Sequence, residues 1–139
     1  MASDLSPVCA IGLMLFRVPG SILLMPYLSI HTNANVADDR QSELLATASK
    51  IAAAHLSKPE EYMMVSITPV RRLIFGGSED PAAFLELRSI GVPDGKRILL
   101  CAELTDLIAG KCGIAKNRIY LVMVDVEARF WGHKGKPFA

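Results

Sequence analysis

The strongest constraint on the fold of this chain is a short segment that occurs twice. Ser57–Val65 (SKPEEYMMV) aligns with Ala115–Met123 (AKNRIYLVM), and in both copies a lysine precedes a tyrosine by four residues. Each copy follows a stretch with helical periodicity and opens an apolar run typical of a strand. Because a further strand is predicted before each helix, the sequence indicates two β-α-β units.

The predicted elements follow one order: strand, helix, strand, turn, strand, helix, strand. Strands are expected at 26–32, 62–67, 83–90 and 119–124, helices through Leu44–His55 and Leu99–Ile108, a turn at 76–81, and a short edge strand through Phe130 and Trp131. Two β-α-β units of this length predict an α/β (α+β) fold, in which a four-stranded mixed sheet carries both helices on one face.

Composition excludes several classes of function. The chain has 139 residues, 51% of them hydrophobic, which suffices for one packed domain. Its net charge of +1 comes without a basic run, so we expect no nucleic-acid partner. Cysteines at 9, 101 and 112 and histidines at 31, 55 and 133 have neither disulfide-framework nor metal-ligand spacing. We therefore expect no metal and no cofactor.

The N-terminal stretch differs in character from the rest. Residues 8–16 are apolar but too few to span a membrane, which takes about 20 apolar residues. Asp4 stands where a signal peptide would be basic. We expect a cytoplasmic protein without a membrane partner, and release from the cell without a classical signal peptide stays open. Residues 1–25 are interpreted as an extension, from a misassigned start or a removed segment, and 26–139 as the domain.

The strands also predict self-association. The runs at 62–67 and 119–124 are apolar on both faces, as buried strands are. Two helices cover only one face of a sheet, so another copy of the chain is the simplest cover for the other face. This argument predicts a closed homo-oligomer without fixing the number of subunits.

Several motifs in order resemble one known family. They are Met25-Pro26 before a strand, Lys58-Pro59-Glu60-Glu61-Tyr62, the turn at 75–81 (FGGSEDP), Ser89-Ile90-Gly91, Asn117-Arg118-Ile119-Tyr120, and the stretch from Trp131-Gly132 to Phe138. Together they resemble the tautomerase superfamily, in particular the macrophage migration inhibitory factor and D-dopachrome tautomerase family, over nearly all of 26–139. The resemblance implies a homotrimer with an active site at each subunit interface.

The resemblance also implies an isomerase that interconverts keto and enol forms of phenylpyruvate-like or dopachrome-like small carboxylic acids. In this family the exposed N-terminal proline is the catalytic base, a role that falls to Pro26. Lys58 would bind the substrate carboxylate and the backbone N–H of Ile90 would add a hydrogen bond. The remaining implied site residues are Tyr120 from the neighbouring subunit and the pocket-lining Tyr62 and Phe138.

These roles have physical reasons. A terminal proline is a secondary amine, and desolvation lowers its pKa, so it can act as a free base near neutral pH. A lysine holds a carboxylate as a point charge, and a backbone N–H can donate to the same group. A tyrosine on an interface wall offers an apolar ring and one hydroxyl.

The position of Pro26 leaves two functions open. An internal prolyl nitrogen is an amide without basicity, so catalysis requires a chain that begins at Pro26. We favour translation from Met25 followed by methionine removal. The alternative is a cytokine-like or other binding protein with a vestigial or blocked pocket and an unidentified receptor. Val122 and His133 depart from the family pattern in the pocket wall, which leaves substrate preference open.

Overall fold

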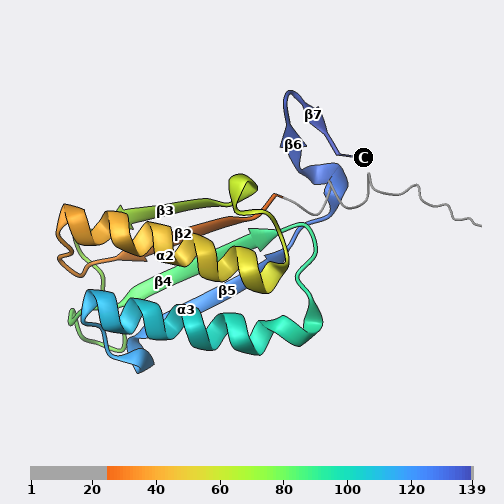
Figure 1. Cartoon of the computed structure of the whole chain (residues 1–139). Helices are drawn as coiled ribbons and strands as arrows, with labels where there is room; N and C mark the ends of the chain where they lie inside the picture. The colour runs from red at the N-terminus through yellow and green to blue at the C-terminus, as the bar shows by residue number, and fades with distance from the viewer. Residues whose placement is uncertain (1–24, 139) are drawn as a thin grey trace, which may run out of the picture.

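A four-stranded sheet forms the centre of the protein. The computed structural model describes residues 25–138. The strands are β2 (Tyr27–Thr32), β3 (Met64–Pro69), β4 (Ala83–Ser89) and β5 (Ile119–Asp125), in the order β3-β2-β4-β5 (Figure 1). β2 pairs parallel with β3 and antiparallel with β4, and β4 pairs parallel with β5. The sheet is therefore mixed, as predicted.

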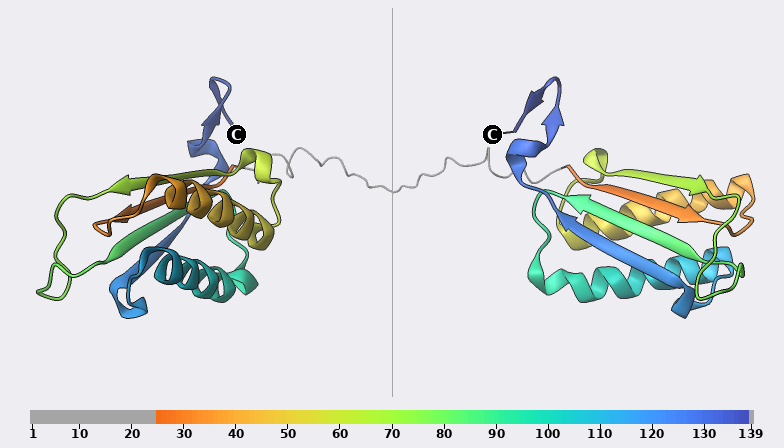
Figure 2. Two further views of the ribbon diagram at one scale, coloured as in Figure 1. Left: turned by 60° about the vertical axis from the view of Figure 1, so that its left-hand side comes forward. Right: turned by 180° about the vertical axis from the view of Figure 1, so that it is seen from behind.

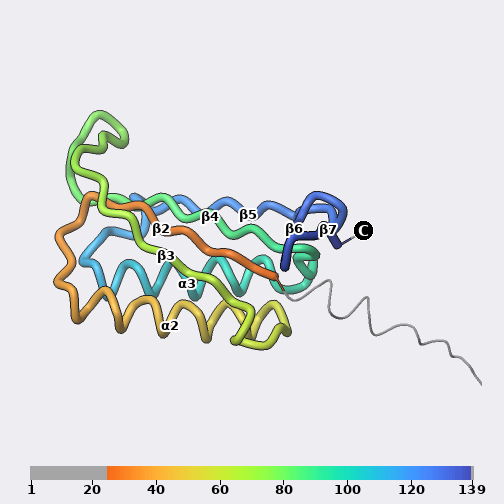
Figure 3. Tube along the Cα trace, turned by 90° about the horizontal axis from the view of Figure 1, so that it is seen from above, coloured from red at the N-terminus to blue at the C-terminus, as the bar shows by residue number. Residues whose placement is uncertain are grey.

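Both long helices, α2 (Asp38–Leu56) and α3 (Arg97–Cys112), lie side by side on one face of this sheet (Figures 2 and 3). The core lies between the layers. Its fully buried large side chains are Leu28, Ile30, Leu85 and Leu87 from the sheet and Leu44, Leu100, Leu104 and Ile108 from the helices. Alternation along the strands explains this layer, because every second side chain faces the helices. None of the described helices is long and apolar enough to cross a membrane.

No element of residues 25–138 covers the face of the sheet opposite the helices, and this face is chemically mixed (Figure 2). Strand register places twelve side chains on it: Met64, Ser66 and Thr68; Tyr27, Ser29 and His31; Phe84, Glu86 and Arg88; and Tyr120, Val122 and Val124. The prediction that the strand near 62–67 is apolar on both faces was wrong, since Ser66 and Thr68 of β3 face this side. β3 and β5 are also the two edge strands.

The C-terminal tail differs from the predicted edge strand. After β5 the chain forms a 3-10 turn, η4 (Ala128–Phe130), and then a two-stranded antiparallel hairpin of β6 (Gly132–His133) and β7 (Lys136–Pro137). This hairpin is separate from the main sheet and stands at the end where β2 begins (Figure 1). Its two strands have two residues each and pair with each other rather than with β3 or β5.

The structure shows which residues of the two β-α-β units are equivalent, and these pairs differ from those of the sequence alignment. Helix α2 ends at Ser57 and α3 at Gly113, both in the left-handed conformation. The 3-10 turns that follow, η1 (Glu60–Tyr62) and η3 (Lys116–Arg118), begin after Pro59 and Ala115 respectively. Lys58 therefore corresponds to Ile114, which is buried, and not to the exposed Lys116. This equivalence places a lysine at a core position.

Candidate active site

A pocket of about 360 Å³ opens where β2 begins. Its lining comes from the start of β2, from the η1 turn and from the C-terminal hairpin: Met25, Pro26, Tyr27, Glu61, Tyr62, Met63, Met64, Trp131, Gly132 and His133. Pro26 is fully buried, and its carbonyl accepts a hydrogen bond of 3.1 Å from the backbone N–H of Met64. This contact extends the β2–β3 pairing by one position and fixes the proline at the pocket wall.

Lys58 is held at the same end of the sheet by the C-terminus of α2. The left-handed Ser57 turns the chain, and the backbone N–H of Lys58 donates to the carbonyl of Ala53 at 2.9 Å. The lysine is only 8% exposed, and its Nζ donates to the carbonyl of Ile90 at 3.0 Å. Burial lowers the pKa of Lys58, and the negative charge of Asp125 partly opposes that shift.

Ile90 and its neighbours connect Lys58 to the end of β5. Ile90 is buried directly after β4, and its carbonyl is the group that meets Lys58. The backbone N–H of Gly91 donates to Oδ1 of Asp125 at 2.9 Å. A buried cation, a carboxylate and a tight backbone turn thus meet beside the first residue of β2, because Tyr27 pairs with Arg88 and Ser89 pairs with Asp125. The expected donation by the Ile90 N–H stays a prediction.

One of the predicted pocket-lining residues lines the pocket itself, and another contacts the residues that form its wall. Tyr62 lines the pocket from η1. Phe138 stacks on His133 with ring centroids 6.3 Å apart and rings inclined by 18°, and its N–H donates to the carbonyl of Trp131 at 3.1 Å. Phe138 therefore supports the wall that Trp131 and His133 form. Sequence analysis did not assign Trp131 to the pocket, because it placed that residue on an edge strand.

Tyr120 lies away from this pocket within one chain. It pairs with Phe84, which in turn pairs with His31, five residues along the chain from Pro26. At about 3.3 Å per residue, that separation is roughly 16 Å along the strands. Tyr120 is 59% exposed, and its ring lies 4.7 Å from that of Phe75. A role for Tyr120 in catalysis thus requires a second subunit.

Residues 25–138 contain no group of three or more histidine, cysteine, aspartate or glutamate side chains placed to hold a metal ion.

Fold and pocket together define an α/β protein of two β-α-β units with a buried proline at the start of its first strand. The profile of the family described as macrophage migration inhibitory factor (MIF) matches residues 25–139. The chain is 39% identical to a macrophage migration inhibitory factor homolog of Brugia malayi over 115 residues, covering 82% of this chain and 99% of that protein. A Trichinella spiralis homolog is 37% identical over 115 residues, with coverages of 82% and 100%.

Solved structures agree with these relatives. A macrophage migration inhibitory factor homologue from Prochlorococcus marinus superposes with a TM-score of 0.77 at 30% identity, covering 81% of this chain and 99% of that one. The protein from Trichinella spiralis superposes with a TM-score of 0.72 at 34% identity, with coverages of 80% and 98%. The chain therefore belongs to the MIF family of the tautomerase superfamily.

Proposed function

We propose that this protein, in the form that begins with Pro26, is a keto-enol tautomerase for phenylpyruvate-like or dopachrome-like small carboxylic acids. One observation carries the proposal: Pro26 is fully buried in the wall of a pocket with aromatic lining, at the sheet end that also holds the buried cation of Lys58. Membership of the MIF family supports the same chemistry.

The residues of this end suit each step of the reaction. As a terminal amine, the Pro26 nitrogen is desolvated, which lowers its pKa and leaves it able to take a proton from the carbon beside the ketone. The same nitrogen returns the proton to the other reacting atom. Lys58 attracts the carboxylate, and the aromatic rings of Tyr62 and Trp131 contact the aryl group. The mechanism uses no cofactor.

The proposal includes a homotrimer, in which Tyr120 completes the pocket of a neighbouring subunit. Two features of the single chain support it. No described element covers the sheet face opposite the helices, and Phe84, Tyr120 and Val122 are exposed on it. The two edge strands, β3 and β5, are available for pairing between copies. We place the protein in the cytoplasm, and release without a classical signal peptide is compatible with the proposal.

A second function follows from the covalent state of Pro26. In the chain of 139 residues Met25 acylates the prolyl nitrogen, and an amide nitrogen is not a base. This observation favours a binding protein with a blocked pocket, of the cytokine-like kind, whenever the long form persists. The length of the N-terminus thus decides between enzyme and binder.

Two versions of the protein test the choice. One begins at Met1, and the other begins at Met25 and is processed to Pro26, with both termini verified by mass spectrometry. Phenylpyruvate tautomerisation is measured for each at neutral pH. We expect the processed form to be active, and the pH profile of its rate should have a limb that reflects the titration of the Pro26 nitrogen. The long form should have little or no activity. Equal activity in an uncleaved long form would remove Pro26 from the mechanism.

A further inference from the structure

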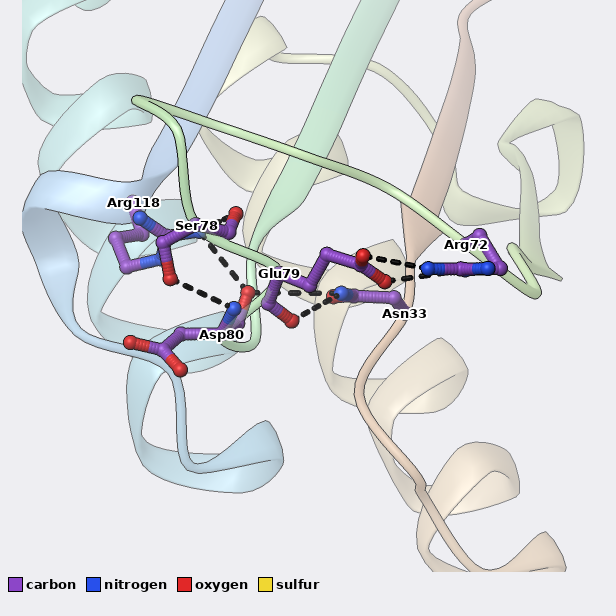
Figure 4. Close-up of polar contacts among 6 residues, drawn as sticks. All are labelled: Asn33, Arg72, Ser78, Glu79, Asp80 and Arg118. Atoms are coloured by element: carbon purple, nitrogen blue, oxygen red, sulfur yellow. Dashed lines mark hydrogen bonds and ion pairs between the residues drawn. The ribbon is translucent and has the colours of Figure 1, made fainter.

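A single arginine side chain, Arg118, makes several hydrogen bonds to the loop between β3 and β4. The guanidinium of Arg118 donates to four backbone carbonyls of this loop: Phe75 at 3.0 Å, Ser78 at 3.1 Å, Asp80 at 3.0 Å and Pro81 at 3.0 Å. Figure 4 shows Arg118 reaching the loop on one side and Asn33 contacting it on the other, where Arg72 of the loop itself pairs with Glu79. A planar guanidinium has about five N–H donors in a fixed fork, which is enough for these carbonyls, whereas an ammonium has only about three.

Phe75 is held by its backbone and by its ring. Its N–H donates to the carbonyl of Ser78 at 2.9 Å and its carbonyl accepts from the N–H of Ser78 at 3.2 Å, which closes a tight turn. Gly76 and Gly77 supply the positive φ values of this turn, +61° and +78°. The guanidinium carbon of Arg118 also lies 5.1 Å from the centroid of the Phe75 ring.

The ring of Phe75 is in turn the contact that Tyr120 makes. The two ring centroids are 4.7 Å apart and the planes are inclined by 42°. Arg118 is the last residue of η3 and Tyr120 the second residue of β5, and both side chains contact the ring of Phe75. The ring of Phe75 thus contacts both Arg118 and Tyr120.

We infer that Phe75 and Arg118 are positioning residues, which hold the Tyr120 ring in the orientation that the neighbouring subunit's pocket requires. The inference rests on the proposed function, because it assigns Tyr120 to that pocket. A half-exposed tyrosine on an edge strand has rotamer freedom, and a site gains affinity when such a side chain is ordered before substrate binds. Phe75 supplies that order, and Arg118 fixes Phe75.

A double-mutant cycle in the processed protein tests the inference. Phe75→Leu should raise KM for phenylpyruvate about three- to ten-fold, the scale of one lost aromatic contact. In the Tyr120→Ala background the same substitution should change KM no further. Arg118→Lys should produce a smaller rise in the parent and none in the Tyr120→Ala background. Arg72→Gln is the matched control, since it removes the Glu79 ion pair on the other side of the loop without a contact to Phe75, and should leave KM unchanged.

The outcomes separate this inference from the proposed function. A rise in KM for Tyr120→Ala without one for Phe75→Leu overturns the positioning role alone. Equal effects of Phe75→Leu in both backgrounds also overturn it, because a purely structural loss is additive. An unchanged KM for Tyr120→Ala contradicts the assignment of Tyr120 itself.

A second readout does not depend on activity. The chain has three tyrosines, so the Tyr120 ring signals in a tyrosine-labelled NMR spectrum can be assigned from their loss in Tyr120→Phe. Phe75→Leu should shift these signals and increase ring mobility, while Arg72→Gln should leave them in place. Unchanged Tyr120 signals in Phe75→Leu would refute the positioning role even if the processed protein were inactive.

Discussion

At the scale of single residues, Lys58 is a lysine that the fold buries. It occupies the place that Ile114 fills in the second β-α-β unit, and it is nearly as buried. Burying a cation costs free energy unless it is paired, and here the Ile90 carbonyl and the charge of Asp125 offset part of that cost. A cation retained at a core position is therefore a candidate for function.

Replacing Lys58 tests its proposed role. In the processed protein, Lys58→Ala should raise KM for phenylpyruvate about ten-fold or more with a smaller effect on kcat, because it removes a charge-assisted contact made before the transition state. Lys50→Ala is the control, since Lys50 is an exposed lysine of α2 that pairs with Glu60. Steady-state kinetics provide the measurement, and an unchanged KM in Lys58→Ala would show that another group binds the carboxylate.

The lowered pKa of Lys58 predicts a pH dependence. A lysine whose pKa lies below its ordinary value of 10.5 loses its proton at a lower pH than an exposed lysine does. The attraction for a carboxylate disappears with that proton, so KM should begin to rise on the alkaline side before pH 10.5. Measuring KM against pH for the parent and for Lys58→Arg checks this.

Arginine stays charged through the alkaline range, so any active Lys58→Arg protein should lack the alkaline rise in KM. A parent KM that stays flat until the titration range of an exposed lysine would contradict a desolvated Lys58.

At the scale of elements, the ends of the two long helices form a matched pair. Ser57 ends α2 at φ +56° and Gly113 ends α3 at φ +67°. The left-handed region disfavours a residue with a Cβ, whereas glycine enters it readily. The first unit therefore carries a local strain that the second unit avoids.

Exchanging the two residues should change stability in opposite directions. Ser57→Gly should increase the free energy of unfolding by about 0.5–1 kcal/mol, and Gly113→Ser should lower it by about 1 kcal/mol. A Cβ at Gly113 meets no atom within 4 Å, so the second effect reports backbone conformation and not a clash. Urea denaturation followed by circular dichroism measures both. A loss of stability in Ser57→Gly would mean that the serine side chain makes a stabilising contact.

At the scale of the whole molecule, we predict a closed homotrimer. The sheet leaves one face without helices and two edge strands without partners in the described chain. Sedimentation equilibrium at micromolar concentration measures the mass. A monomer would contradict both the assembly and the shared pocket.

Mixed trimers test the shared pocket directly. Co-expressed Lys58→Ala and Tyr120→Ala subunits, each impaired alone, should show a kcat/KM above the mean of the two parents. About one quarter of the sites in a random mixture then receive both wild-type side chains from different subunits. If Tyr120 acts within its own chain no such site forms, and kcat/KM equals the mean.

The sequence by itself determined the elements and much of the candidate site. Periodicity located both helices and all four strands, since local alternation reports which side of an element is buried. The Gly76-Gly77 pair predicted its turn because glycine tolerates positive φ. The family motifs predicted Pro26, Lys58 and Tyr62 as site residues, and the structure places all three at one end of the sheet, where Lys58 contacts Ile90.

Only the tertiary structure decided how these parts meet. Nothing local predicts that Ser57 adopts a left-handed conformation, so the two-residue shift of the repeat and the burial of Lys58 were not foreseen. The contact of Lys58 with Ile90 joins residues 32 apart in sequence. The C-terminal hairpin, which is separate from the main sheet, adds Trp131 to the pocket wall beside His133. Such contacts depend on the packing of distant segments, which periodicity along the chain does not encode.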